Sequence, residues 1–152
     1  MKERYIVFAT VGKKGHAKLS PAGKQHAEKV GMLIKQNLEL KGKTGILYYD
    51  FQDHAKQMAQ IVSRGTRAEL LGKNHRILSM EGNFDPKEAV NTVDMYWPQY
   101  DNLIVLSTLS LCYRAAKIFA RRFGLNEADI VPPLDDQIII LNYQPVTTEV
   151  PA

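Results

Sequence analysis

Short apolar runs alternate along the chain with longer segments in which apolar residues recur every three or four positions. Residues 5–11 form an apolar, β-branched run ended by Gly12, which is typical of a buried strand. Ser20 and Pro21 then favour a helix start, because Ser can cap free backbone N–H groups and Pro suits the first helical position. The residues that follow predict one buried helical face, made of Ala27, Val30, Leu33, Ile34 and Leu38.

The same alternation continues to the end of the chain. Further strands are expected at 45–49, at 76–78 as a weak candidate, at 102–107 and at 137–143. Further helices are expected at 53–63, from 85 to about 95, and at 109–123. Alternating strands and helices predict an α/β fold with three layers, α/β/α, around a mostly parallel central sheet. The inward residues of the helix at 53–63 are expected to be Ala55, Met58, Ala59 and Val62.

Composition indicates a single globular domain. The 152 residues are 45% hydrophobic and 24% charged, and we expect one domain at 1–145 followed by a loose tail at 146–152. The lone Cys112 excludes an intramolecular disulfide and multi-cysteine zinc motifs, and it is expected to be a small core residue. The apolar runs are far shorter than the roughly 20 residues of a membrane helix. We therefore expect a cytoplasmic protein with no membrane partner.

Charge and motifs limit the partners further. Twenty basic and sixteen acidic residues give a formal net charge of +4, which attracts phosphate-bearing partners by field alone. The basic residues are dispersed without an aromatic–basic pattern, so nucleic acid is not expected as a partner. The four histidines show no short metal-ligand spacing, and neither G-x-x-x-x-G-K-[ST] nor G-x-G-x-x-G occurs. We expect no metal and no cofactor. The oligomeric state is not predicted.

Loops after the strands are the candidate binding region, because ligands of open α/β sheets bind beyond the carboxyl ends of the strands. The segments in question are 10–18, 50–54 and 107–110. Their candidate side chains are hydroxyl groups, the imidazole of His54 and two neighbouring lysines: Thr10, Ser107, Thr108, Ser110, His54, Lys13 and Lys14. The ligand expected for such a site is a phosphorylated small molecule or protein.

Four segments carry a family resemblance. Residues 19–28, LSPAGKQHAE, are similar to an L-[ST]-x-x-G-x-x-Q-A segment, and residues 48–59, YYDFQDHAKQMA, are similar to S-S-x-x-x-R-A-x-Q-T-A. Residues 103–108 stand where a late V-x-S-H strand end is expected, and residues 132–142 fit a closing strand. The chain thereby resembles the histidine phosphatase, or phosphoglycerate mutase-like, superfamily, in its short bacterial phosphohistidine-phosphatase branch. The resemblance implies the phosphoglycerate mutase-like fold.

The resemblance also implies a site whose reactive residues are missing here. The family's nucleophilic histidine lies in an R-H-G motif, which reads Thr10-Val11-Gly12 in this chain. The arginine of the second segment is His54, and the second histidine of the late strand is Thr108. The reaction needs an imidazole to attack phosphorus and cationic donors to hold its oxygens. We therefore expect an inactive protein with a binding or regulatory role.

The degenerate pocket is expected to be either filled or used for a weakly held anion. Its residues are Thr10, Val11, Gly12, Lys13, His54 and Thr108. An alternative is a phosphatase with a non-standard site that uses His54 or His16, since histidine titrates near working pH. The opposite interpretation makes His54 a partly buried structural residue and His16 a mobile surface residue. A third hypothesis is a partner-binding surface at Tyr96 and Trp97 or on the basic face.

Overall fold

The computed structural model describes residues 4–12, 14–38, 42–72, 86–96, 98–130 and 138–143. Strands and helices alternate in this order: β1 (Arg4–Thr10), α1 (Pro21–Asn37), β2 (Thr44–Leu47), α2 (Asp53–Thr66), β3 (Glu69–Leu70), α3 (Pro86–Tyr96), β4 (Asn102–Ser107), α4 (Leu109–Arg122), a short 3-10 helix (Glu127–Asp129) and β5 (Ile139–Tyr143). The predicted alternation is confirmed. The candidate strand at 76–78 lies outside the described residues.

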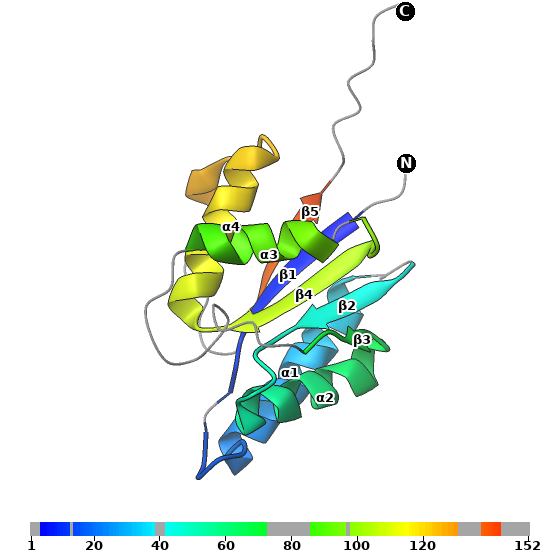
Figure 1. The fold of residues 1–152 in the computed structure, drawn as a ribbon, viewed down its shortest axis with the longest axis vertical. Helices are drawn as coiled ribbons and strands as arrows, with labels where there is room; N and C mark the ends of the chain where they lie inside the picture. Colours follow the sequence, from blue (N-terminus) through cyan, green and yellow to red (C-terminus); the bar gives the residue numbers. More distant parts are fainter. Residues whose placement is uncertain are drawn as a thin grey trace, which may run out of the picture.

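The sheet is five-stranded with the order β3-β2-β4-β1-β5 (Figure 1). β1, β2, β3 and β4 are parallel to one another, and β5 runs antiparallel to them, next to β1. Because β1, β4 and β2 are parallel, their carboxyl ends meet at one edge, the lower edge in Figure 1. This edge is where an open α/β sheet binds its ligands.

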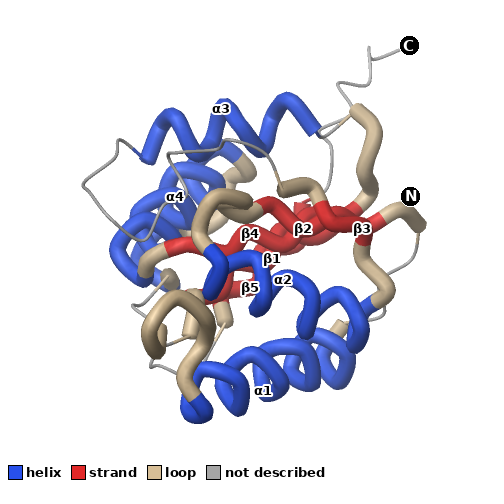
Figure 2. The backbone as a smooth tube through the Cα atoms, turned by 60° about the horizontal axis from the view of Figure 1, so that its bottom comes forward, coloured by secondary structure: helices blue, strands red, loops and turns tan. Residues whose placement is uncertain are grey.

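Two pairs of helices cover the two faces of the sheet. In Figure 2, α3 and α4 lie on one side of the strands and α1 and α2 lie on the other. α1 packs on α2, and α3 packs on α4. The expected three-layer α/β/α fold with a mostly parallel sheet is therefore confirmed.

The ends of several elements differ from the sequence prediction. β3 was not expected, since both of its residues are exposed and only its pairing with β2 defines it. β2 ends at Leu47 rather than at residue 49, and β5 begins at Ile139 rather than at 137. The start of α1 agrees with the prediction, because Ser20 Oγ accepts a hydrogen bond from Gly23 N at 3.0 Å and Pro21 is the first helical residue.

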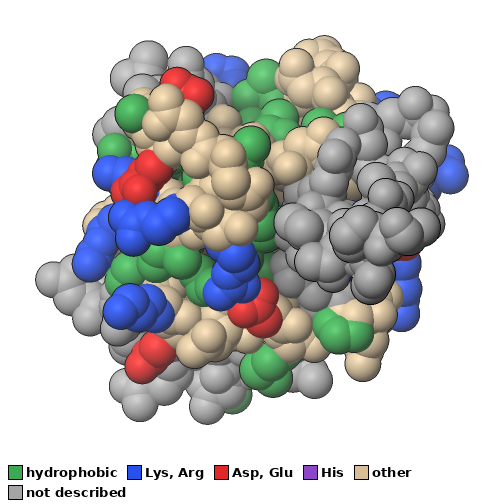
Figure 3. Space-filling view, turned by 90° about the horizontal axis from the view of Figure 1, so that it is seen from above, with side chains coloured by type: hydrophobic (Ala, Val, Ile, Leu, Met, Phe, Trp, Pro, Cys, Tyr) green, Lys and Arg blue, Asp and Glu red, His purple; other side chains and the backbone are tan. Residues whose placement is uncertain are grey.

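Ion pairs neutralise several cations at the C-terminal end of α4. Arg122 donates to both carboxylate oxygens of Asp94 at 2.8 Å, and Arg121 donates to Glu127 Oε2 at 2.8 Å. Lys117 lies 4.0 Å from the other oxygen of Glu127. Seen from above, Lys and Arg side chains lie beside Asp and Glu side chains (Figure 3). Exposed pairs of this kind each contribute little stability, but each one neutralises the cation that forms it.

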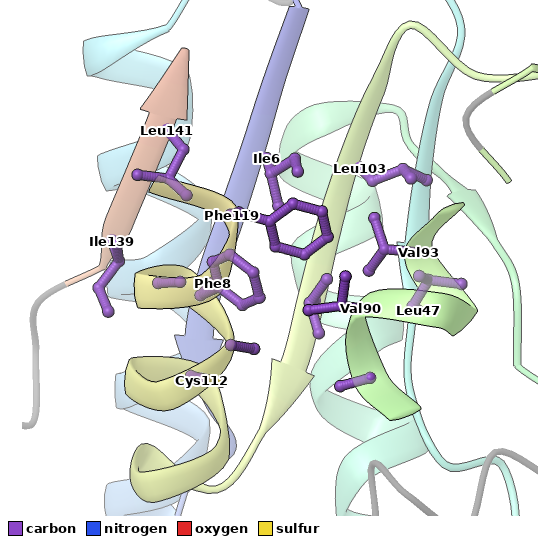
Figure 4. Close-up of a cluster of buried hydrophobic side chains, with 14 of the residues drawn as sticks. Ile6, Phe8, Leu47, Val90, Val93, Leu103, Cys112, Phe119, Ile139 and Leu141 are labelled. Carbon is purple, nitrogen blue, oxygen red and sulfur yellow. The ribbon is translucent and has the colours of Figure 1, made fainter. Parts of the chain in front are cut away.

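The core consists of two apolar layers, one on each side of the sheet. Alternate residues of β1 point to opposite faces, so Ile6 and Phe8 join the α3–α4 side and Val7 and Ala9 join the α1–α2 side. On the α3–α4 side, Phe119 of α4 packs against Phe8 with ring centroids 6.1 Å apart (Figure 4). The inward positions predicted for the helix at 53–63 are all buried, including Met58.

Candidate functional site

The ends of β1 and β4 lie side by side at the carboxyl edge of the sheet. Thr10 is the register partner of Ser107, and Val11 N donates to Ser107 O at 3.1 Å. Val11 and Thr108, which follow these two residues, are therefore on adjacent strand ends. Val11 is only 4% exposed and belongs to the apolar layer under α1 and α2. A solvent-facing reactive group is absent at this position.

Gly12 is enclosed by two helices. Its N–H donates to Met58 Sδ of α2 at 3.4 Å in a buried contact, so the protein itself satisfies this backbone donor. A Cβ atom on Gly12 would lie 2.6 Å from Gly23 O and 2.9 Å from Gly23 Cα in the first turn of α1. The end of β1 is thus held tightly between α1 and α2. Lys13, the next predicted pocket residue, lies outside the described residues.

His54 is buried at the start of α2. It is the second residue of the helix and stands one turn before Met58, so both side chains lie on the same helix face. His54 is 5% exposed and interacts with other groups of the protein. The burial of His54 therefore supports a structural role rather than the role of a solvent-facing base.

Thr108 caps α4. Its Oγ1 accepts a hydrogen bond from Leu111 N at 3.1 Å, and its carbonyl oxygen accepts one from Cys112 N at 3.0 Å. The hydroxyl therefore stabilises the helix start, as an N-cap does. Behind it, the Cys112 thiol lies 3.6 Å from Ala9 O, and burial raises the pKa of Cys112 to about 12. The expectation that Cys112 is a core residue is confirmed, and its thiol stays protonated at neutral pH.

The loop after β1 closes back on itself. Lys14 forms an isolated antiparallel bridge with Leu19, and Gly15 N donates to Lys18 O at 2.7 Å. Leu19 N donates to Gln57 Oε1 of α2 at 2.8 Å, which fixes the end of the loop. His16 is exposed at the loop tip, as the surface interpretation expects. The described part of the loop presents Lys14, His16 and Lys18 to solvent.

His26 of α1 also lies at this edge, outside the set of predicted pocket residues. Its Nε2 lies 2.6 Å from Thr10 O, and a carbonyl oxygen only accepts, so Nε2 carries the hydrogen of this bond. The imidazole thereby ties α1 to the end of β1. The helical spacing held a weak signal for this position, since His26 stands three residues after Gly23 and four before Val30, both on the buried face.

Acidic groups oppose an anion on the β2–α2 side of the edge. Asp50 and Asp53 flank the loop that leads to His54, and Lys56 Nζ lies 4.0 Å from Asp50 Oδ1. Burial raises the pKa of the neighbouring Tyr48, and the negative charge of Asp50 raises it further. The local field on this side is therefore not the strongly positive one that a phosphate site provides.

The described parts of the chain contain neither a metal-binding cluster nor a membrane-spanning helix. No group of three or more His, Cys, Asp or Glu residues there could hold a metal ion. No helix in the same ranges combines the length and apolar character needed to cross a membrane. Tyr96, expected with Trp97 as a partner-binding surface, is in the core at 9% exposure, whereas Trp97 lies outside the described residues.

Comparison with solved structures identifies the fold. A protein from Nakamurella multipartitia assigned as phosphohistidine phosphatase SixA superposes with a TM-score of 0.72 and 13% sequence identity, covering 93% of this chain and 86% of that chain. A SixA assignment from Agrobacterium tumefaciens gives 0.68 and 11% identity over 91% of both chains. A protein histidine phosphatase SixA complexed with tungstate gives 0.53 and 17% identity over 74% of both.

The chain therefore has the α/β fold of the histidine phosphatase superfamily, as its segments predicted. Within that fold, SixA proteins are among the structures it resembles. No protein-family model and no curated protein matches the sequence itself. The low identities show the fold alone, so the activity of this chain has to be argued from its own residues.

Proposed function

We propose that this chain is a catalytically inactive protein with the histidine phosphatase fold, which acts in binding or regulation. The proposal rests on how the residues at the strand edge are buried and hydrogen-bonded. Val11 stands where the family resemblance places the nucleophilic histidine, and its side chain is buried and has no lone pair. Gly12 N–H is already bonded to Met58 Sδ. An attacking imidazole and free donors for phosphate oxygens are both required for the family reaction.

The remaining replacements support the same proposal. Thr108 stands in place of the second histidine, and its hydroxyl serves as the N-cap of α4. His54 stands in place of an arginine, is buried, and cannot supply a bidentate guanidinium fork. The alternative enzyme would need His54 or His16 to attack phosphorus. Burial of His54 disfavours this, and exposed His16 would need a partner to activate it. That the protein is cytoplasmic and that its ligand is phosphorylated are predictions from the sequence.

Assays with p-nitrophenyl phosphate and a phosphohistidine peptide test the proposal. We expect no turnover above the buffer rate, because Val11, which stands in place of the attacking histidine, cannot form a phosphoryl-enzyme intermediate. An active protein histidine phosphatase in the same assays shows that the substrates are competent. Turnover that His54→Ala or His16→Ala abolishes, with the circular dichroism spectrum unchanged, would refute the inactive protein and establish the alternative phosphatase.

Weak anion binding at the rim of the same edge is a second candidate. It is supported by three helices, α1, α2 and α4, that follow β1, β2 and β4, since helix N-termini favour anions. Thr10 and Thr108 are only partly buried at the two adjacent strand ends. The similar SixA phosphatase is complexed with tungstate, a tetrahedral oxyanion. The acidic residues near His54 keep such binding weak.

Titration of the labelled protein with phosphate and with tungstate, followed by amide chemical shifts, tests this second candidate. We expect saturable shifts at Thr10 and Thr108 in the millimolar range, with affinity reduced several-fold in Thr10→Ala. Thr92→Ala is the matched control, because Thr92 Oγ1 donates to Glu88 O on the exposed side of α3. Shifts that are equal in both variants, or that never saturate, would remove the anion site.

A further inference from the structure

The turn between β2 and α2 presents an aromatic side chain to solvent. Among the described residues, Phe51 is the most exposed large apolar side chain, at 71%. A hydrogen bond from Gln52 N to Tyr49 O at 3.3 Å closes the turn and restrains the residues between them. The turn lies at the carboxyl edge of the sheet, the lower edge in Figure 1, where open α/β sheets bind their ligands.

A second aromatic ring supports Phe51 from the protein side. The ring centroids of Tyr49 and Phe51 are 5.8 Å apart and the rings meet edge to face, with an angle of 71° between their planes. Tyr49 is partly buried and packs against the apolar layer on the α3–α4 side of the sheet. Phe51 thus extends an anchored aromatic surface outwards, and most of its own side chain is in contact with water.

Folding does not explain an aromatic residue at this position. Turns favour Gly, Pro, Asn, Asp and Ser, each for a backbone or hydrogen-bonding reason that does not apply to phenylalanine. Because most of the Phe51 side chain is exposed, it adds little to the apolar core. Aromatic residues are enriched where proteins meet their partners. A contact with a partner would bury the Phe51 ring.

Two carboxylates flank the aromatic side chain along the chain. Asp50 lies in the turn, and Asp53 is the first residue of α2 and is exposed. Within the described part of the chain, neither carboxylate accepts a hydrogen bond. Lys56 Nζ lies 4.0 Å from Asp50 Oδ1, which is too far for a hydrogen bond, and both side chains are partly exposed. The carboxylate oxygens therefore keep their capacity to accept hydrogen bonds from a ligand. We refer to Tyr49, Asp50, Phe51 and Asp53 as the Phe51 surface.

Long-range attraction to the Phe51 surface is small, because cations lie on the same side of the edge. Lys56 offsets part of the charge of Asp50. Lys18 is exposed on the loop whose end is hydrogen-bonded to α2. Selectivity therefore has to come from direct contacts with the ring and the carboxylate oxygens, which act over short distances.

We propose that the Phe51 surface binds an arginine side chain of a partner protein, whose guanidinium stacks on the Phe51 ring and donates to Asp50 or Asp53. A guanidinium is planar and weakly hydrated, stacks on aromatic faces and donates hydrogen bonds in a fork that fits a carboxylate. A phosphate of nucleic acid or lipid would instead be repelled by both carboxylates. A purely apolar side chain would bury them without partners. The proposal names a partner for a binding role and does not depend on the absence of catalysis.

Titration of the labelled protein with a short peptide of arginine, glycine and serine, followed by amide chemical shifts, tests the proposal. We expect saturable shifts centred on residues 49–53. The same peptide with lysine in place of arginine should bind more weakly, because an ammonium lacks the planar fork. The peptide with glutamate in place of arginine should not bind. Tighter binding of the glutamate peptide or of mixed-sequence duplex DNA overturns the proposal, and so does an absence of saturable shifts at residues 49–53.

Variants of the turn separate the contacts that the proposal requires. Phe51→Leu keeps an apolar side chain but removes the ring, so it should weaken binding several-fold, whereas Phe51→Trp should strengthen it. Asp50→Asn combined with Asp53→Asn should also weaken binding several-fold. Lys56→Ala should strengthen it about twofold, because Lys56 no longer competes for Asp50. Native affinity in Phe51→Leu, or weaker binding in Lys56→Ala, would contradict binding of a cation on the ring.

Matched controls lie elsewhere on the surface. Met95→Ala truncates a side chain of α3 that is 70% exposed, and Glu28→Gln combined with Asp129→Asn removes two exposed carboxylates outside the turn. Both variants should bind the arginine peptide as the native protein does. A loss in either control equal to the loss in the turn variants overturns the proposal. Circular dichroism of every variant confirms that the fold is retained.

Discussion

Met58→Ala should lower the free energy of unfolding by about 3 to 4 kcal/mol, which is the range for truncating a fully buried side chain in a tightly packed core. Met58 is 0% exposed and lies in the apolar layer with Val11, so its removal leaves a cavity beneath the strand edge. It also leaves Gly12 N–H without its sulfur acceptor. Chemical denaturation followed by circular dichroism measures the effect.

Met58→Leu is the control for this prediction. Leucine keeps most of the volume and removes the sulfur, so it should cost under about 1.5 kcal/mol. The difference between the two variants isolates the packing of the strand edge from the weak hydrogen bond to Gly12. Equal stabilities of the alanine and leucine variants would mean that Met58 does not fill the space beneath β1, and the description of a filled site would fail with it.

The architecture was predictable because burial imposes a period on the sequence. The run at 103–106 is apolar throughout and became the centre of β4, a strand that is buried along its whole length between the two helical layers. The start of α1 was predictable from Ser20 and Pro21, which act locally. β3 was not, because Glu69 and Leu70 are both exposed and pair only with β2. A strand defined by pairing alone has no hydrophobic period to detect.

The candidate site was predictable only in part. Val11 and Thr108 are adjacent because β1 and β4 are parallel and end at the same edge of the sheet. That β1 and β4 are neighbours depends on the strand order. The contacts of Met58 with Gly12 and of His26 with Thr10 depend instead on how helices pack across the sheet. The sequence predicted that Met58 points inward, but helical periodicity contains no information on which backbone atom it meets. Tertiary packing supplies that information.

These contacts give the strand edge a structural role in place of a chemical one. In a reactive site, donors stay free to meet a ligand and the reactive group faces a cavity. Here the donors at Val11 and Gly12 are bonded within the protein, and the hydroxyl of Thr108 accepts a hydrogen bond as a helix cap. These three groups thereby contribute to the stability of the fold. Binding in this protein is therefore expected on its rim and outer surfaces.

Gly12→Ala should destabilise the protein by about 3 kcal/mol, at the upper end of the cost of overpacking. The new Cβ would lie 2.6 Å from Gly23 O and 2.9 Å from Gly23 Cα. Both atoms belong to the backbone of α1, so no side-chain rotation relieves the clash. β1 and α1 must move apart, which also strains the bond from His26 Nε2 to Thr10 O. Thermal and chemical denaturation of the variant measure the loss.

Gly65→Ala separates this close approach from the general effect of replacing glycine. Gly65 lies in α2, and a Cβ there would meet its nearest atom at 3.8 Å, an ordinary contact. Alanine loses less conformational entropy than glycine in a helix, so this variant should gain about 0.5 kcal/mol. The two substitutions thus have opposite expected signs. If Gly12→Ala were as stable as the native protein, β1 would have room beside α1, and a side chain could enter the edge that we describe as closed.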